Sequence, residues 1–129
     1  MNAREKGLSL WDTISSVLWL LMDASWMFGF VLAAQCLMLP TTVAALVTFR
    51  YTERSAAAYA ITGAMNAWLL MNISWMLSEF HTVQAMLTAS RWLFATGVVL
   101  LLTAFGVTRS ARETFASVLT RFRRFRISA

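Results

Sequence analysis

Long stretches without a basic residue constrain this chain more than any other feature. No Lys or Arg occurs from residue 8 to residue 49, where the only acidic residues are Asp12 and Asp23. From residue 55 to residue 90, Glu79 is the single charged residue. Hydrophobic residues make up 59% of the 129-residue chain, against about 45–50% in ordinary soluble domains. A chain this short cannot bury so much apolar surface in one core. The sequence therefore predicts an all-α integral membrane protein.

The length of the uncharged stretches predicts how many helices cross the membrane. A bilayer core about 30 Å thick requires about 20 apolar residues of helix. The first stretch is about twice that long, so it must contain two spans, with a turn near Gly29. The second half divides in the same way, with a loop around residues 79–84. We expect one membrane domain over 1–129, with four transmembrane helices over residues 9–28, 31–49, 57–78 and 86–108.

The basic residues predict the orientation, because Lys and Arg collect in the cytoplasmic loops of membrane proteins. If both termini are cytoplasmic, all of the eleven Lys and Arg residues except Arg91 lie inside. The sequence thus predicts a multi-pass protein of a bacterial-type inner membrane, with cytoplasmic N- and C-termini. A cleaved signal peptide does not fit, because its apolar region would be too long and would contain Asp23.

A nine-residue motif occurs twice in the chain. WLLMDASWM at 19–27 recurs as WLLMNISWM at 68–76, with seven of nine positions identical. The match predicts a tandem duplication of a two-helix unit, with copies over 1–56 and 57–108. A two-helix unit returns the chain to the same side of the membrane, so both copies share one orientation. We expect a compact four-helix bundle in which the first and third helices face each other.

The third span also carries a face of small residues, which let a neighbouring helix approach closely. These residues are Ala56, Ala60, Gly63, Ala64 and Ala67. The face is expected to pack either inside the bundle or against another protomer.

The repeated motif places polar groups between Trp rings. Residues i, i+4 and i+7 share a helix face, so Trp19, Asp23 and Trp26 form one stripe. Its copy consists of Trp68, Asn72 and Trp75, extended by Glu79. One interpretation is an Asp23–Asn72 hydrogen bond that fixes the register of two helices. The other is a proton or cation site that uses the Asp23 carboxylate and the ring faces.

No residue pattern indicates catalysis, a cofactor or a metal site. His81, Glu79 and Cys36 show no recognised ligand spacing. The chain has no Gly-rich phosphate loop, nucleophile elbow or HExxH motif. We therefore expect a protein that is not an enzyme and carries no metal or cofactor.

The C-terminal segment 109–129 reads as a basic amphipathic helix lying at the cytoplasmic surface of the membrane. Large apolar residues recur at helical spacing among arginines. The residues expected to contact anionic lipid or a partner are Arg121, Phe122, Arg123, Arg124 and Phe125. Nucleic-acid binding is the alternative for an Arg-rich end, but we expect none, because the segment emerges at the membrane surface.

Two functions remain open at this point. The first is a non-enzymatic membrane subunit or homo-oligomeric assembly unit, in which the helices provide packing surfaces. The second is a small oligomeric channel or transporter for protons or cations that uses Asp23. Four spans leave little room for an aqueous path, so conduction would require several protomers, and the first function is favoured.

Overall fold

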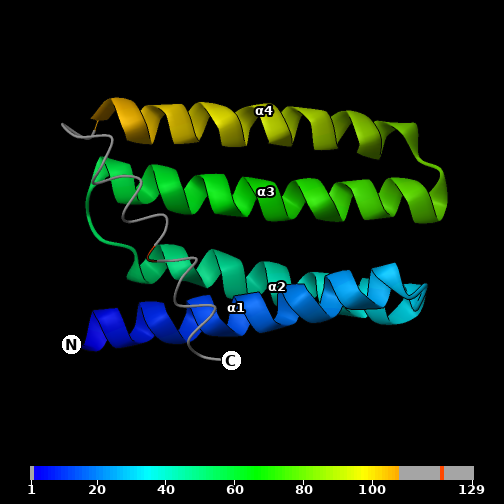
Figure 1. Ribbon diagram of the computed structural model, residues 1–129, viewed down its shortest axis with the longest axis horizontal. Helices are drawn as coiled ribbons and strands as arrows, with labels where there is room; N and C mark the ends of the chain where they lie inside the picture. The colour runs from blue at the N-terminus through cyan, green and yellow to red at the C-terminus, as the bar shows by residue number, and fades with distance from the viewer. Residues whose placement is uncertain (1, 108–119, 121–129) are drawn as a thin grey trace.

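The computed structural model describes residues 2–107 and residue 120, and the described part is built from four α-helices. They are α1 (Ala3–Met27), α2 (Val31–Tyr51), α3 (Ala56–His81) and α4 (Gln84–Val107). The helices run side by side with alternating direction (Figure 1). The N-terminus, the α2–α3 loop and the end of α4 therefore share one end of the molecule. The α1–α2 and α3–α4 turns lie at the other end. The expected C-terminal amphipathic helix, with its Arg and Phe contacts, lies outside the described residues.

The apolar stretch predicted that the first helix begins near residue 9, but it begins at Ala3. The side chain of Asn2 accepts a hydrogen bond from the backbone N–H of Glu5 (2.9 Å), and the Glu5 carboxylate accepts one from the Asn2 backbone N–H (3.0 Å). This reciprocal cap satisfies N–H groups that a helix start otherwise leaves unpaired. Polar capping, and not hydropathy, therefore sets this boundary.

The turn expected near Gly29 is present, with α1 ending at Met27 and α2 beginning at Val31. Gly29 has a φ of +75°, which L side chains rarely adopt. The loop expected around residues 79–84 is present but shorter, over residues 82–83, because α3 continues to His81 and Glu79 is helical. The helix ends where Thr82 adopts the left-handed conformation, with a φ of 53°. The polar residues at the end of α3 thus prolong the helix instead of forming the loop.

The hydrophobic core lies where the first three helices meet. Met22 from α1 packs with Met38 from α2 and with Leu69, Ile73 and Met76 from α3. Most buried residues of α2 are spaced alternately by four and three, as in a helix that presents one narrow seam to its neighbours, and Ala44 is buried beside this seam. They include Ala34, Met38, Thr41, Ala45 and Thr48.

Small residues bring α3 and α4 together. The buried residues of α4 are Ser90, Gly97 and Ala104, spaced by seven. A Cβ atom placed on Gly97 would lie 3.6 Å from the Ala64 carbonyl oxygen and 3.6 Å from the Ala67 Cβ. The small-residue face of the third helix therefore packs inside the molecule, against α4.

The four helices do not form the expected compact bundle. The closest helix pairs are α1 with α2 and α3 with α4, and α2 also packs on α3. Helix α4 lies on the side of α3 that faces away from α1 and α2 (Figure 1). The backbones of α1 and α3 therefore do not lie close together. These two helices meet chiefly through long side chains. The reason is that the small face of α3 is occupied by α4.

Two of the four helices, α2 and α4, are long and apolar enough to cross a membrane by their length and composition. Their 21 and 24 residues correspond to about 30–36 Å of helix at 1.5 Å per residue, which matches the hydrocarbon core of a bilayer.

Candidate functional site

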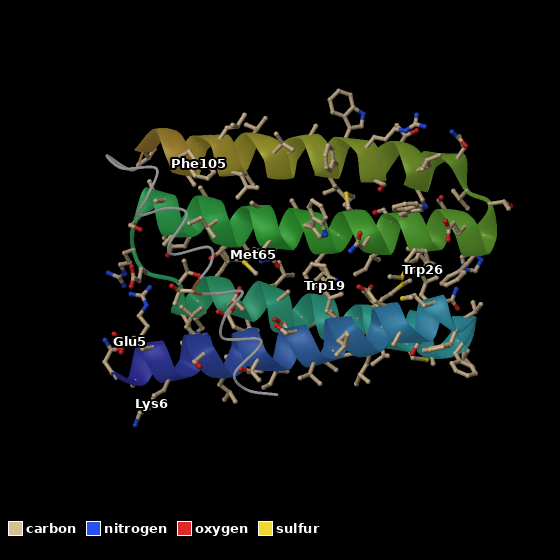
Figure 2. The ribbon with its side chains drawn as sticks, in the orientation of Figure 1. Glu5, Lys6, Trp19, Trp26, Met65 and Phe105 are labelled. Carbon is tan, nitrogen blue, oxygen red and sulfur yellow. The ribbon has the colours of Figure 1, made fainter. Side chains whose placement is uncertain are left out.

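One end of the contact between α1 and α3 consists of three of the residues singled out in the repeat. The Trp26 and Trp75 rings have their centroids 6.2 Å apart, with an angle of 57° between the ring planes. The Trp26 indole N–H donates a hydrogen bond to the Glu79 carboxylate (3.1 Å). Figure 2 shows Trp26 in the space between α1 and α3, close to the end that carries the turns. The structure therefore brings together two tryptophans that occupy equivalent positions in the two copies of the motif.

Asp23 lies one turn before Trp26, and its carboxyl group is incompletely paired. Its Oδ1 atom is buried and has no hydrogen-bond partner. The Trp19 side chain, one turn earlier in the helix, lies within hydrogen-bonding reach of the same carboxyl group. The described residues contain no hydrogen bond between Asp23 and Asn72. A register-fixing bond between these two residues is thus not part of this structure, and Asp23 keeps an unsatisfied acceptor in an apolar setting.

The second copy of the motif has different surroundings from the first. Trp19 packs against the core cluster, between the first two helices and α3 (Figure 2). Its counterpart Trp68 is 49% exposed and contacts Phe94 of α4, with ring centroids 6.2 Å apart. Trp68 is therefore separate from the Asp23 group. The cause is the asymmetric packing, since α3 has neighbours on two sides whereas α1 packs mainly on α2.

A small cavity, which the sequence did not indicate, lies in the half of the molecule nearer the N-terminus and is lined by apolar and polar residues. It has a volume of about 40 Å³, enough for a few water molecules. Helices α1, α2 and α3 all contribute to its wall. Its polar lining residues are Asp12, Ser15, Ser16, Thr48, Thr62 and Asn66, and Trp19 and Met65 also line it. Asp12 and Ser16 continue the Trp19 stripe toward the N-terminus, but nothing local in the sequence relates them to Thr48 or Asn66.

Hydrogen bonds hold the polar residues in and beside the wall of this cavity. Thr52 and Thr62 share a hydrogen bond between their hydroxyl groups (3.0 Å), which joins the end of α2 to α3. Asn66 donates from Nδ2 to the Thr62 carbonyl (2.9 Å), and Thr48 donates to the Ala45 carbonyl (2.6 Å). These groups are satisfied within their own helices or by one another.

Basic residues border the cavity end of the molecule. Arg4 donates from Nε to the Tyr51 carbonyl (3.2 Å) and from its guanidinium group to the Thr52 carbonyl. These carbonyls belong to the C-terminal end of α2, where a positive charge is favourable. The same end of the molecule also carries Lys6, Arg50 and Arg54. Positive charge thus collects at the end of the molecule that carries the N-terminus.

At the opposite end of the molecule, a side-chain hydrogen bond joins α2 to α3. Gln35 of α2 and His81 of α3 lie with Nε2 atoms 2.7 Å apart, in a hydrogen bond whose direction depends on the His tautomer. Cys36 is exposed and unpaired by any disulfide. Among residues 2–107 and 120, no group of three His, Cys, Asp or Glu side chains is placed to hold a metal ion.

Comparison with known proteins adds no further assignment to this site. No protein-family model, no curated protein and no solved structure matches the chain.

Proposed function

We propose that the chain is a four-span membrane protein that acts as a non-enzymatic assembly unit, as copies of itself or as a subunit of a larger membrane complex. The observation that carries this proposal is the exposure of large apolar side chains on every helix. Examples are Leu20 of α1, Leu39 of α2, Trp68 of α3 and Trp92 of α4. Soluble monomers rarely expose apolar surface so extensively, whereas a bilayer provides an apolar solvent for it.

The packing supports extending the membrane span from two helices to four. Helix α1 packs along α2, and α3 packs along α4. A bilayer that holds α2 and α4 therefore also surrounds their two partners. Four of the five basic residues in the described part lie at the end that carries the N-terminus, with Arg91 as the exception. This end is proposed to face the cytoplasm, where the basic tail would meet anionic lipid.

The outer face of α4 supports the assembly role. This helix has one main neighbour, α3, and it exposes Trp92, Phe94, Val99 and Leu102. Lipid solvates such a face, and a helix from a second protein of matching shape also packs on it. Extraction in a mild detergent followed by native mass spectrometry tests the proposal. A discrete homo-oligomer or heteromer is expected. A monomer at every protein concentration and in every mild detergent would contradict it.

A second function, proton or cation transfer through Asp23, is favoured by the unpaired Oδ1 atom. An ionisable group at membrane depth is expensive and normally marks a functional site. The Asp23→Asn variant removes the charge and keeps the shape. If Asp23 carries ions, proton or cation flux into liposomes is lost while folding and assembly persist. Equal flux in the variant and in the original protein would exclude this role for Asp23.

A further inference from the structure

Two apolar residues of the repeated motif have opposite surroundings in its two copies. Leu69 and Met76 of α3 are each 1% exposed and belong to the core cluster that α3 forms with the first two helices. Their counterparts in the first copy of the motif, Leu20 and Met27 of α1, are 70% and 78% exposed. The helix face that is covered in the second copy is thus uncovered in the first, among the described residues.

The uncovered residues of α1 form a row along the whole helix. They are spaced alternately by three and four, which is the spacing of a helix that packs on one neighbour. This row, the α1 seam, consists of Leu10, Thr13, Val17, Leu20, Ala24 and Met27. All of them are exposed except Ala24, which is half-buried. At the motif's spacing of 49 residues, the seam from Thr13 onward corresponds to α3 residues that are all buried: Thr62, Asn66, Leu69, Ile73 and Met76.

The opposite face of the same two helices is buried in both copies. Met22 and Met71 occupy equivalent positions of the motif and are both buried. Met22 packs with Met38 of α2, and the Met71 carbonyl accepts a hydrogen bond from Ser90 of α4. Each helix therefore packs in the same way on the helix that follows it. The two copies differ at the seam, which α3 covers with the preceding helices and α1 leaves open.

Helix α4 has a matching seam on its outer side. The side toward α3 carries Ser90, Gly97 and Ala104. Half a turn away lies a row of exposed residues spaced alternately by four and three. This row, the α4 seam, consists of Thr88, Trp92, Ala95, Val99 and Leu102. Helix α4 follows α3 as α2 follows α1, and α2 is the helix that packs on the buried seam of α3.

From this arrangement we infer that the α1 seam of one copy packs on the α4 seam of a second copy with the same orientation in the membrane. The inference rests on the proposed assembly function and names the surfaces that join the copies. Helices α1 and α4 run in opposite directions, as α2 and α3 do (Figure 1). The contact between copies therefore repeats the antiparallel contact within one copy. It joins two different surfaces, so it produces rings or open rows of copies and not a closed dimer.

The exposure of Trp68 supports the same arrangement. Its counterpart Trp19 packs against the core cluster, which contains the buried seam residues Leu69 and Met76, whereas Trp68 is exposed. In the proposed assembly, the α1 seam of the neighbouring copy takes the place of these residues beside Trp68. The second copy of the motif thereby obtains the cover that the first copy already has.

Cross-linking between copies tests this contact. Leu20 lies seven residues before the end of α1, and Trp92 lies eight residues after the start of α4. Both therefore lie about 10–12 Å from the end of the molecule that carries the turns. Two differently tagged full-length forms, one with Leu20→Cys and one with Trp92→Cys, are co-expressed in a Cys36→Ser background and oxidised in the membrane. A cross-linked dimer that carries both tags is the expected product.

Leu39 of α2 provides the matched control. It is as exposed as Leu20 and lies eight residues after the start of α2, so its depth matches that of Trp92. Leu39→Cys paired with Trp92→Cys should give several-fold less mixed dimer. Equal cross-linking of Leu20→Cys and Leu39→Cys to Trp92→Cys would overturn the inference, and so would cross-linking of Leu20→Cys mainly to itself.

A second measurement does not depend on cross-linking geometry. Leu20→Ala combined with Met27→Ala is expected to raise the dissociation constant between copies about tenfold or more, because truncated side chains leave the seam poorly packed. Leu39→Ala should leave the constant unchanged. Oligomers that tolerate the double substitution would overturn the inference and leave the assembly function standing. A protein that is monomeric in native mass spectrometry would contradict both.

Discussion

Replacing Asp23 with Leu tests how the buried carboxyl group is accommodated. The Oδ1 atom has no hydrogen-bond partner, and a buried unsatisfied polar atom costs about 1–3 kcal/mol. Removing the whole carboxyl group removes this cost together with the contact to Trp19. Asp23 is half-buried in the last part of α1, so the larger Leu side chain has room to extend outward. The free energy of unfolding is therefore expected to rise by about 1–3 kcal/mol.

The assay is reversible unfolding in mixed micelles, followed by Trp fluorescence, because Trp19 and Trp26 lie close to the substituted position. Ser90→Ala is the matched comparison. Its hydroxyl is buried and donates to the Met71 carbonyl (3.1 Å), so its loss is expected to lower the free energy of unfolding by about 0.5–1.5 kcal/mol. The two substitutions should thus act in opposite directions.

A fall in stability for Asp23→Leu would refute this reasoning, because it would mean that the carboxylate has a stabilising partner in the membrane. A rise in stability accompanied by loss of proton or cation flux would indicate that the chain retains an unfavourable group for its activity. Stability and flux are therefore measured on the same preparation of the variant.

Three further predictions concern the packing and the tail. Gly97→Leu is expected to lower the free energy of unfolding by about 1–3 kcal/mol, because Ala64 and Ala67 leave room for little more than a Cβ atom between α3 and α4. Gly106→Leu is the control and should leave the free energy of unfolding nearly unchanged in the same assay, because nothing lies within 4 Å of its added Cβ. Glu79→Ala is expected to cost about 0.5–1.5 kcal/mol by removing the acceptor of the Trp26 indole N–H, and unchanged stability would show that this bond contributes nothing. Truncation after Arg112 should leave insertion intact and weaken binding to anionic vesicles in a sedimentation assay; an unchanged affinity for the vesicles would contradict the proposed role of the tail.

Residue patterns predicted much of the fold because they act locally. The number of helices follows from the length of the apolar stretches, and the first turn follows from Gly29 between apolar residues. The boundaries were less accurate where capping decides them, as at Asn2 and Thr82. Hydropathy reports how apolar a segment is, whereas caps and left-handed residues determine where its helix begins and ends.

The site was predictable only in part, because it depends on which helices become neighbours. The repeat identified Trp26 and Trp75, which do come together. It also placed Trp19 and Trp68 at equivalent positions of two stripes, but Trp68 contacts Phe94 of α4 and lies apart from the Asp23 group. The cavity escaped prediction because its polar residues lie on three helices, and Ser and Thr side chains that bond within their own helix are ordinary in apolar segments.

The central claim, that all four helices cross the membrane with both termini in the cytoplasm, is tested most directly by reporter fusions at three positions. Glu53 lies in the α2–α3 loop and Thr82 at the α3–α4 turn, so the two positions lie at opposite ends of the molecule. The account predicts a cytoplasmic signal for fusions after Glu53 and at the C-terminus, and a signal from the outer side for a fusion at Thr82. A cytoplasmic signal at Thr82 would contradict the four-span arrangement.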